Sequence, residues 1–215
     1  PPGTSLAMSG PPALSPLIHT LTHVIRVCDQ RVMPWKNGKG STAEILVSPP
    51  GTSLAKMDFT YRLSSAPVTE DGSFSHFPGF QRILLPIEGA GFSLNGTPYE
   101  THVPAVFSGS DDTHCELLRG PIKDLGLIYD PSKAGASVKV SKLPLATRLD
   151  PRHTHLMYVL EGETVQAHTT GVDTVTDSLM KGDTLVLHGA TDIQVNANGD
   201  TSGLVAMFTL DEGHE

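Results

Sequence analysis

Short apolar runs follow one another along this chain about every ten residues, and most are closed by glycine, proline, asparagine or aspartate. Such runs have the length of β-strands, and the residues between them are those that tight turns favour. No long segment repeats its apolar residues every three or four positions, as an amphipathic helix does. The pattern therefore predicts an all-β sandwich or barrel.

Two of the predicted strands carry polar residues on one face. In Phe59–Ser65 the residues Arg62 and Ser64 share a face, and in the strand around Ile45 the residues Thr42 and Glu44 do the same. An arginine in mid-strand faces solvent on an open sheet. If its face lines a cavity, however, its guanidinium can grip a carboxylate with two hydrogen bonds.

Turn residues organise the rest of the first half. Residues 81–94 read as a hairpin around Glu88-Gly89-Ala90-Gly91, and Asn95-Gly96 is a second tight-turn signal. The connection 71–80 holds three phenylalanines, so we expect it to fold over an apolar surface. Leu17–Val27 reads as the first strand of this half.

The chain divides into a tail and two halves. Residues 1–16 are rich in proline, glycine and serine and predict a flexible tail. Residues 130–136 have the composition of a linker, which separates a first half at 17–130 from a second half at 137–215. The halves share short patterns in the same order, since Glu88-Gly89 is matched by Glu161-Gly162.

Charge and composition limit the partners. The formal charge is −8, from 23 acidic and 15 basic residues, which argues against nucleic acid or an anionic membrane as a partner. No run of about 18 apolar residues is present, and the first residues lack the pattern of a secretory signal. We therefore expect a soluble, cytoplasmic protein, with Cys28 and Cys115 as reduced, buried thiols.

Several motifs carry a resemblance to known families. In the second half, the segment Tyr158–Glu163 followed by Gly182-Asp183 resembles a cupin. The first half, from about Arg31 to Ile128, resembles the HutD/Ves family of bicupins. The motifs of that resemblance are Pro34-Trp35-Lys36-Asn37-Gly38, Thr42 with Glu44, 61–66, 71–75, 77–82, 88–91 and 120–124.

The resemblance implies a fold and a type of function. The fold is two cupin barrels, each a jelly-roll-like double-stranded β-helix, packed as one compact unit with a ligand-sized pocket. Members linked to histidine utilisation are thought to bind a small acidic intermediate, formylglutamate-like or urocanate-like, in a regulatory or flux-limiting role. No established enzymatic activity comes with the family. This sequence departs from the family at Lys39, where glycine is usual, and near Gly126, where asparagine is usual.

The predicted ligand site lies in the first barrel. Arg62 and Arg82 would hold carboxylates, and Lys36 and Asn37 would cover the polar end of the ligand. The remaining candidates add hydrogen bonds (Thr42, Glu44, Ser64, Ser75) or an apolar wall or lid (Trp35, Phe74, Phe77). Trp35 serves the core equally well, and Glu44 serves equally well as a structural partner of Arg62.

Metal binding and catalysis form the alternative. Many cupins hold a divalent metal through an HxH pair, a glutamate and a later histidine, and the first half has no such pattern. In the second half His153 and His155 have the HxH spacing, and His188 is a third candidate ligand. A lyase, isomerase or oxygenase would use these histidines with a metal, or Glu44 as a metal-free base beside Lys36.

Two further expectations concern cofactors and partners. We expect no cofactor, and we expect a small acidic metabolite as the partner. Beside ligand binding and catalysis, a third hypothesis for the function is a non-catalytic scaffold with a vestigial pocket. Exposed barrel edges make a homodimer possible.

Overall fold

The computed structural model describes residues 22–34, 40–171, 175–198 and 202–213. Within these ranges the regular elements are β-strands, apart from one short 3-10 helix, η1 (Val27–Asp29). None of the described residues forms a helix with the length and apolar character that crossing a lipid bilayer requires. The predicted flexible tail, residues 1–16, lies outside the described residues.

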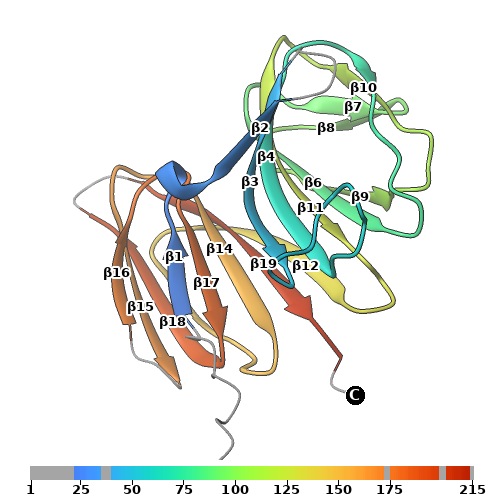
Figure 1. The fold of residues 1–215 in the computed structure, drawn as a ribbon. Coiled ribbons are helices and arrows are strands. Elements are labelled where there is room, and N and C mark those ends of the chain that lie inside the picture. Colours follow the sequence, from blue (N-terminus) through green and yellow to red (C-terminus); the bar gives the residue numbers. More distant parts are fainter. Residues whose placement is uncertain (1–21, 35–39, 172–174, 199–201, 214–215) are drawn as a thin grey trace, which may run out of the picture.

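The first half pairs a large antiparallel sheet with a small one (Figure 1). The large sheet has the strand order β2 (Arg31–Pro34), β3 (Ser41–Ser48), β4 (Tyr61–Val68), β11 (Ile122–Tyr129), β6 (Gln81–Glu88) and β9 (Ala105–Ser108). The small sheet has the order β5 (Gly72–Ser73), β10 (His114–Leu117), β7 (Phe92–Leu94) and β8 (Thr97–Tyr99).

The second half repeats this plan. Its large sheet has the order β1 (Thr22–Ile25), β17 (Thr184–His188), β14 (Thr154–Glu161), β19 (Leu204–Asp211) and β12 (Gly135–Lys142). Its small sheet has the order β13 (Leu145–Arg148), β18 (Ala190–Ala197), β15 (Val165–Gly171) and β16 (Val175–Leu179).

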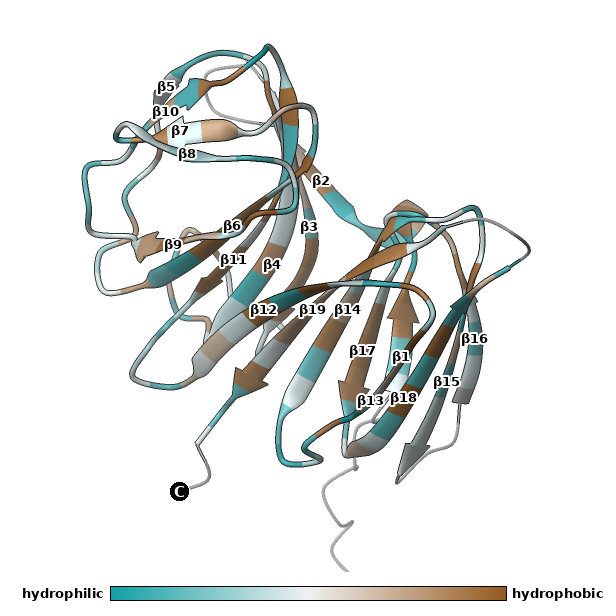
Figure 2. Ribbon diagram, turned by 180° about the vertical axis from the view of Figure 1, so that it is seen from behind, coloured by the Kyte–Doolittle hydropathy of each residue, from teal (hydrophilic) through white to brown (hydrophobic). Residues whose placement is uncertain are grey.

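The two large sheets pack against each other through one shared core. Leu63 of β4 and Leu127 of β11 belong to the same buried cluster as Leu156 of β14 and Phe208 of β19. The large sheets are therefore covered on both faces, and β17 and β19 are hydrophobic along most of their length (Figure 2). Burial of this apolar surface holds the halves together as one unit.

The interiors of the two barrels differ. Inside the second barrel, apolar side chains from both sheets fill one continuous cluster that includes Met157, Leu187 and Val195. Inside the first barrel there are two separate apolar clusters, one around Phe92 and one around Phe59. Polar residues of the large sheet, among them Arg62 and Ser64, complete the lining of the first barrel and make its interior the candidate site.

The N-terminal strand corrects the predicted domain boundary. β1 pairs with β17 of the second half, so grouping residues 17–130 as the first barrel assigns this strand to the wrong half. Asp183, which is fully buried, accepts hydrogen bonds from Arg26 Nη1 at 2.8 Å and from the Val27 amide at 3.0 Å. This carboxylate anchors the start of the chain on the second half before β2 crosses to the first.

The turn at Glu88-Gly89 shows that a second prediction, the hairpin at residues 81–94, is wrong. Residues 81–94 do not form a hairpin, because β6 pairs with β9 and β11 while β7 belongs to the other sheet. The turn is instead a corner between sheets, and Gly91 (φ +100°) has no room for a side chain, since a Cβ there would lie 2.1 Å from the Tyr99 carbonyl oxygen. By contrast, the tight turn predicted at Asn95-Gly96 is confirmed, because it joins β7 to β8 with Leu94 opposite Thr97.

The cysteines differ in exposure. Cys115 is fully buried, as predicted, but Cys28 in η1 is exposed, so the prediction of two buried thiols is half wrong.

Candidate functional site

Three strands of the first large sheet present polar side chains to the barrel interior. Arg62 of β4 and Arg82 of β6 both lie opposite Ile128 of β11, one on each side. One pleat further along, Ser64 and Leu84 lie on either side of Gly126. Because facing residues in neighbouring strands point to the same side of a sheet, both arginines share the inner face.

Arg62 is held by two partners. Its Nε donates to Glu44 Oε2 at 2.7 Å, and its Nη1 donates to Ser64 Oγ at 3.0 Å. A β-bulge in β3 between Glu44 and Leu46 keeps Glu44 opposite Ser64 and brings Val47 opposite Arg62. The Arg62 side chain is only 3% exposed, and its Nη2 is buried without a hydrogen-bond partner among the described residues. A buried charged donor that is left unpaired is costly, so Nη2 is a place where an acceptor would be stabilising.

Arg82 has aromatic neighbours instead of an acid. Its guanidinium carbon lies 5.1 Å from the ring centre of Phe74, 5.2 Å from that of Phe77 and 4.9 Å from that of Phe107. The one hydrogen bond of its side chain among the described residues is long, from Nη1 to the Ser75 carbonyl oxygen at 3.4 Å. Burial lowers the pKa of Arg82 to about 10, so the group remains positively charged at neutral pH.

Asp124 adds a buried carboxyl to the same face. It lies on β11 two residues before Gly126, and its Oδ1 accepts the Ala66 amide hydrogen at 3.0 Å. Burial raises the pKa of Asp124 to about 7, although the Ala66 hydrogen bond and the charge of Arg82 act in the opposite direction. The carboxyl is therefore divided between its neutral and ionised forms near neutral pH.

Gly126 lies between these groups, at a closely packed position. A Cβ placed on Gly126 would meet only the Leu84 side chain at 3.3 Å and the Ser64 carbonyl oxygen at 4.0 Å. Because even a Cβ would be tight against Leu84, glycine suits this position, which lies between Asp124 on one side and the row of Arg62 and Arg82 on the other.

The structure brings part of the predicted site together. Arg62 with Glu44 and Ser64 forms one group, and Arg82 with Phe74 and Phe77 forms a second. Ser75 is exposed, and its backbone carbonyl oxygen accepts the hydrogen bond from Arg82, while its hydrogen bond to a ligand stays a prediction. Thr42 is half-buried on β3. The remaining candidates, Trp35, Lys36 and Asn37, lie outside the described residues.

Sequence reasoning misses two residues of this face. Phe107 completes the aromatic surround of Arg82, but β9 supplies it from a strand that looks ordinary in the sequence. Asp124 did carry a signal, because it is an acidic residue in a run that is otherwise largely apolar, Ile122–Tyr129, and it has the same parity as Gly126 and Ile128. The neighbouring Lys123 makes the pair look like a solvated turn.

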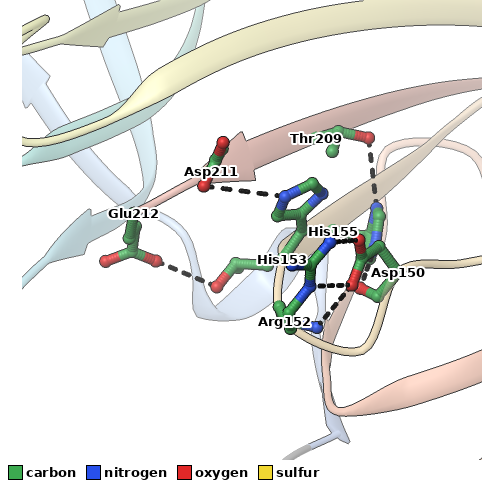
Figure 3. A network of polar contacts seen from close by, with 8 residues as sticks. Asp150, Arg152, His153, His155, Thr209, Asp211 and Glu212 are labelled. Atoms are coloured by element: carbon green, nitrogen blue, oxygen red, sulfur yellow. Dashed lines mark hydrogen bonds and ion pairs between the residues drawn. The ribbon is translucent and has the colours of Figure 1, made fainter. Parts of the chain in front are cut away.

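Two of the three histidines considered as metal ligands, His153 and His155, lie beside Asp150 and Thr209 in a network of polar contacts (Figure 3). His155 is 4% exposed and occupied at both ring nitrogens. Its Nε2 lies 3.1 Å from the Asp150 carbonyl oxygen, which only accepts, so Nε2 carries the hydrogen and Nδ1 accepts from Thr209 Oγ1 at 3.1 Å. Burial lowers the pKa of His155, which agrees with a neutral ring. His155 therefore has no lone pair free for a metal.

The other two histidines do not complete a site. His188 is paired with Thr154, and these two residues lie on the face of the sheet that packs against the first half, whereas His155 lies on the opposite face. His153 lies 3.6 Å from Asp211 through its Nε2. The described residues contain no group of three histidine, cysteine or acidic side chains placed to hold a metal ion. The predicted candidate set His153, His155 and His188 is therefore not assembled.

A surface hollow of about 520 Å³ lies at the junction of the two halves, away from the first barrel's inner face. His102 of the first half lines it together with Lys142, Leu143, Glu161 and Gly203 of the second. Its charged residues are one lysine and one glutamate, so it lacks the concentration of positive charge found around Arg62 and Arg82.

Comparison with known families identifies the family of this chain. The HutD family model matches residues 28–205, which includes the whole first large sheet, three of the five strands of the second, and every described residue of the site. The chain belongs to the HutD family. The predicted resemblance to HutD and Ves proteins is thereby confirmed.

Two curated relatives support the assignment. An uncharacterized 21.2 kDa protein in the hutC 3′ region of Pseudomonas putida is 40% identical over 121 residues, which is 54% of this chain and 62% of that protein. Protein Ves of Citrobacter koseri is 34% identical over 128 residues, which is 55% of this chain and 65% of that protein. The chain thus spans less than two thirds of the length of each of these relatives.

Solved structures confirm the bicupin fold. HutD from Pseudomonas fluorescens SBW25 is 31% identical with a TM-score of 0.71, and the match covers 90% of this chain and 100% of that one. A conserved protein of unknown function from Pseudomonas aeruginosa PAO1 is 30% identical with a TM-score of 0.74 and the same coverage. Oxalate decarboxylase from Bacillus subtilis, 9% identical with a TM-score of 0.61 over 94% of this chain and 80% of that one, shares the fold alone.

Proposed function

We propose that this HutD-family chain binds a small carboxylate-bearing metabolite inside its first barrel, between Arg62 and Arg82. The observation that carries the proposal is the buried Nη2 of Arg62, which has no hydrogen-bond partner among the described residues. A ligand carboxylate would supply the missing acceptor through a charge-assisted hydrogen bond.

The charges of the inner face favour an anion. Arg62 is balanced by Glu44, but Arg82 has no carboxylate within ion-pair distance among the described residues. Asp124, the other acid of this face, is partly neutral at pH 7 because of its burial. The face therefore carries excess positive charge in a setting of low dielectric, where an anion gains more than it would in water.

The first barrel is favoured over the second because of what fills each interior. The second barrel is occupied by a continuous apolar cluster that includes Met157, Leu185 and Val205. The first barrel instead offers arginine, serine and aspartate side chains on the inner face around Gly126. Of the two interiors, as far as the described residues go, the first offers the charged partners that an acidic ligand needs.

The spacing of the arginines suggests the class of ligand. Arg62 and Arg82 are separated by one strand, so their Cα atoms lie about 10 Å apart on the sheet. A small acid with a second polar group at its other end suits two such anchors. The family assignment supports formylglutamate-like or urocanate-like acids, and we propose a regulatory or flux-limiting role in histidine catabolism.

Catalysis through Glu44 is the rival proposal. Its carboxylate is 12% exposed, and its Oε2 accepts a hydrogen bond from Arg62 Nε at 2.7 Å, so the arginine already engages this oxygen. This geometry favours a structural role for Glu44 and supports binding without turnover.

A panel of small acids tests the proposal by thermal unfolding. N-formyl-L-glutamate and urocanate should raise the melting temperature in a concentration-dependent way, because a ligand that binds only the folded state stabilises it. The corresponding uncharged amides should not. If none of the acids changes the melting temperature more than its amide does, the proposed function is wrong.

A further inference from the structure

Asp124 is a buried acid without a cationic partner. The residue is 8% exposed, and no cationic side chain lies within ion-pair distance of it among the described residues. Its carboxyl accepts one backbone hydrogen bond, from the Ala66 amide, and the Ser65 hydroxyl is directed to its backbone oxygen instead. Placing an ionised carboxylate in such surroundings is unfavourable unless a nearby positive charge compensates it.

Each neighbouring element contributes a group that bears on this carboxyl. Arg82 of β6 is the charge on the inner face that favours the ionised form, and Lys123 of β11 acts in the same direction. Cys115 faces this interior from β10 in the opposite sheet. Burial, with the charge of Asp124 adding to it, raises the pKa of the Cys115 thiol to about 11, so the thiol stays neutral. Arg62 and Glu44, on β4 and β3, are paired with each other.

Ligand binding at Arg82 would remove this compensation. An anion placed on Arg82 neutralises the charge that favours ionised Asp124, and it adds a second negative charge to the same interior. Two like charges in one buried site raise the pKa of the weaker acid. We propose that Asp124 takes up a proton from solvent when an anion binds at Arg82, so that the first barrel binds its ligand as an anion together with a proton. This inference rests on the proposed function.

The coupling has a measurable consequence for affinity. When the carboxyl is ionised in the free protein and protonated in the complex, the dissociation constant rises by up to about tenfold for each pH unit. Below the pKa of the free protein the carboxyl is already neutral, and the affinity becomes independent of pH. Affinity should therefore fall as the pH rises above about 7.

The first experiment needs no ligand. The pKa of the Asp124 carboxyl is measured by carbon-13 NMR in the wild-type protein, in Arg82→Gln and in Arg82→Lys. Removing the charge should move the pKa of Asp124 upward by about one unit or more, whereas the lysine variant should keep it near the wild-type value. An Asp124 pKa that is the same in all three proteins overturns the inference.

The second experiment uses N-formyl-L-glutamate, whose carboxylates stay ionised from pH 6 to 9. Calorimetric titration in phosphate and in Tris at pH 8 gives the number of protons taken up. We expect uptake approaching one proton per ligand, and none in Asp124→Asn. If that variant does not fold, the wild-type pH series alone decides, since an affinity that is constant from pH 7 to 9 contradicts the inference.

The outcomes separate the two proposals. Binding without proton uptake overturns the role of Asp124 and leaves the proposed function standing. If no acid binds at all, the proposed function fails, and the ligand-free NMR measurement still decides whether Arg82 controls the Asp124 carboxyl.

Discussion

Arg62 Nε lies 2.7 Å from Glu44 Oε2 inside the first barrel, where the arginine is 3% and the glutamate 12% exposed. The pair joins β4 to β3 across the bulge in β3 and leaves one guanidinium nitrogen unpaired. A charge pair in this position fixes the geometry of the inner face. It also makes each member costly to remove, because the other would remain buried with its charge uncompensated.

Glu44→Ala should destabilise the protein strongly. Truncating one member of a buried ion pair costs on the order of 3–5 kcal/mol in the free energy of unfolding, as measured by chemical denaturation. Glu116→Ala, which removes an exposed glutamate of β10, is the matched control and should change stability by less than about 0.5 kcal/mol. Equal effects of the two substitutions would mean that the Glu44–Arg62 pair does not support the fold.

Asp124→Asn should make the protein more stable above pH 7. In the folded state the pKa of Asp124 is raised from 3.8 to about 7, so the folded protein retains a proton that the unfolded chain releases. The protonated carboxyl contributes its full stability to the folded protein below about pH 4, and this stability is lost as the pH rises to about 7. Because asparagine does not titrate, the variant does not lose this stability as the pH rises. Its side-chain oxygen can still accept the Ala66 hydrogen bond.

Chemical denaturation at pH 4.5 and pH 8 checks this prediction. The free energy of unfolding of the variant should exceed that of the wild-type protein by a few kcal/mol at pH 8 and by little at pH 4.5. A variant that is less stable at both values would show that the carboxylate itself is stabilising.

Removing divalent metal should leave the protein unchanged. Since both ring nitrogens of His155 are occupied and His188 lies on the other face of its sheet, chelation with EDTA should not alter the melting temperature. Elemental analysis of protein purified without a histidine tag provides the independent readout. A stoichiometric transition metal, lost together with stability on chelation, would restore the metal-dependent alternative.

Turnover would promote the enzymatic alternative over binding. We expect no consumption of N-formyl-L-glutamate or urocanate by the wild-type protein, because Glu44 is engaged by Arg62 rather than free to accept a proton. Product analysis by mass spectrometry checks this. Product formation that disappears in Glu44→Gln would show that the glutamate is a base after all.

Most of the fold could be predicted from the sequence, because strand positions depend on local alternation. The shared face of Arg62 and Ser64, and that of Thr42 and Glu44, follow from a period of two residues. Pairing partners depend on distant segments, and this is why β1 was assigned to the first half although its hydrogen bonds go to β17. Local reasoning likewise read Glu88-Gly89 as a hairpin turn, whereas the chain uses it to pass from one sheet to the other.

The site was predictable only in part, for a related reason. Arg62, Arg82, Phe74 and Phe77 stand out as unusual residues in their segments, and the structure places them in two groups on one inner face. The importance of Asp124 depends on its burial, which results from packing of the small sheet over the large one. Because Asp124 follows Lys123 in the sequence, the pair looks solvent-exposed, and the sequence alone does not predict that the Asp124 carboxyl is buried.

The measurement that bears most directly on the central claim is a calorimetric titration of N-formyl-L-glutamate into the wild-type protein, Arg82→Ala and Arg148→Ala. Arg148 is 95% exposed on the second half and serves as a matched loss of one positive charge. We predict saturable binding to the wild-type and Arg148→Ala proteins and at least about tenfold weaker binding to Arg82→Ala, with all three folded by circular dichroism. Equal affinity for Arg82→Ala and the wild-type protein would contradict a ligand site between Arg62 and Arg82.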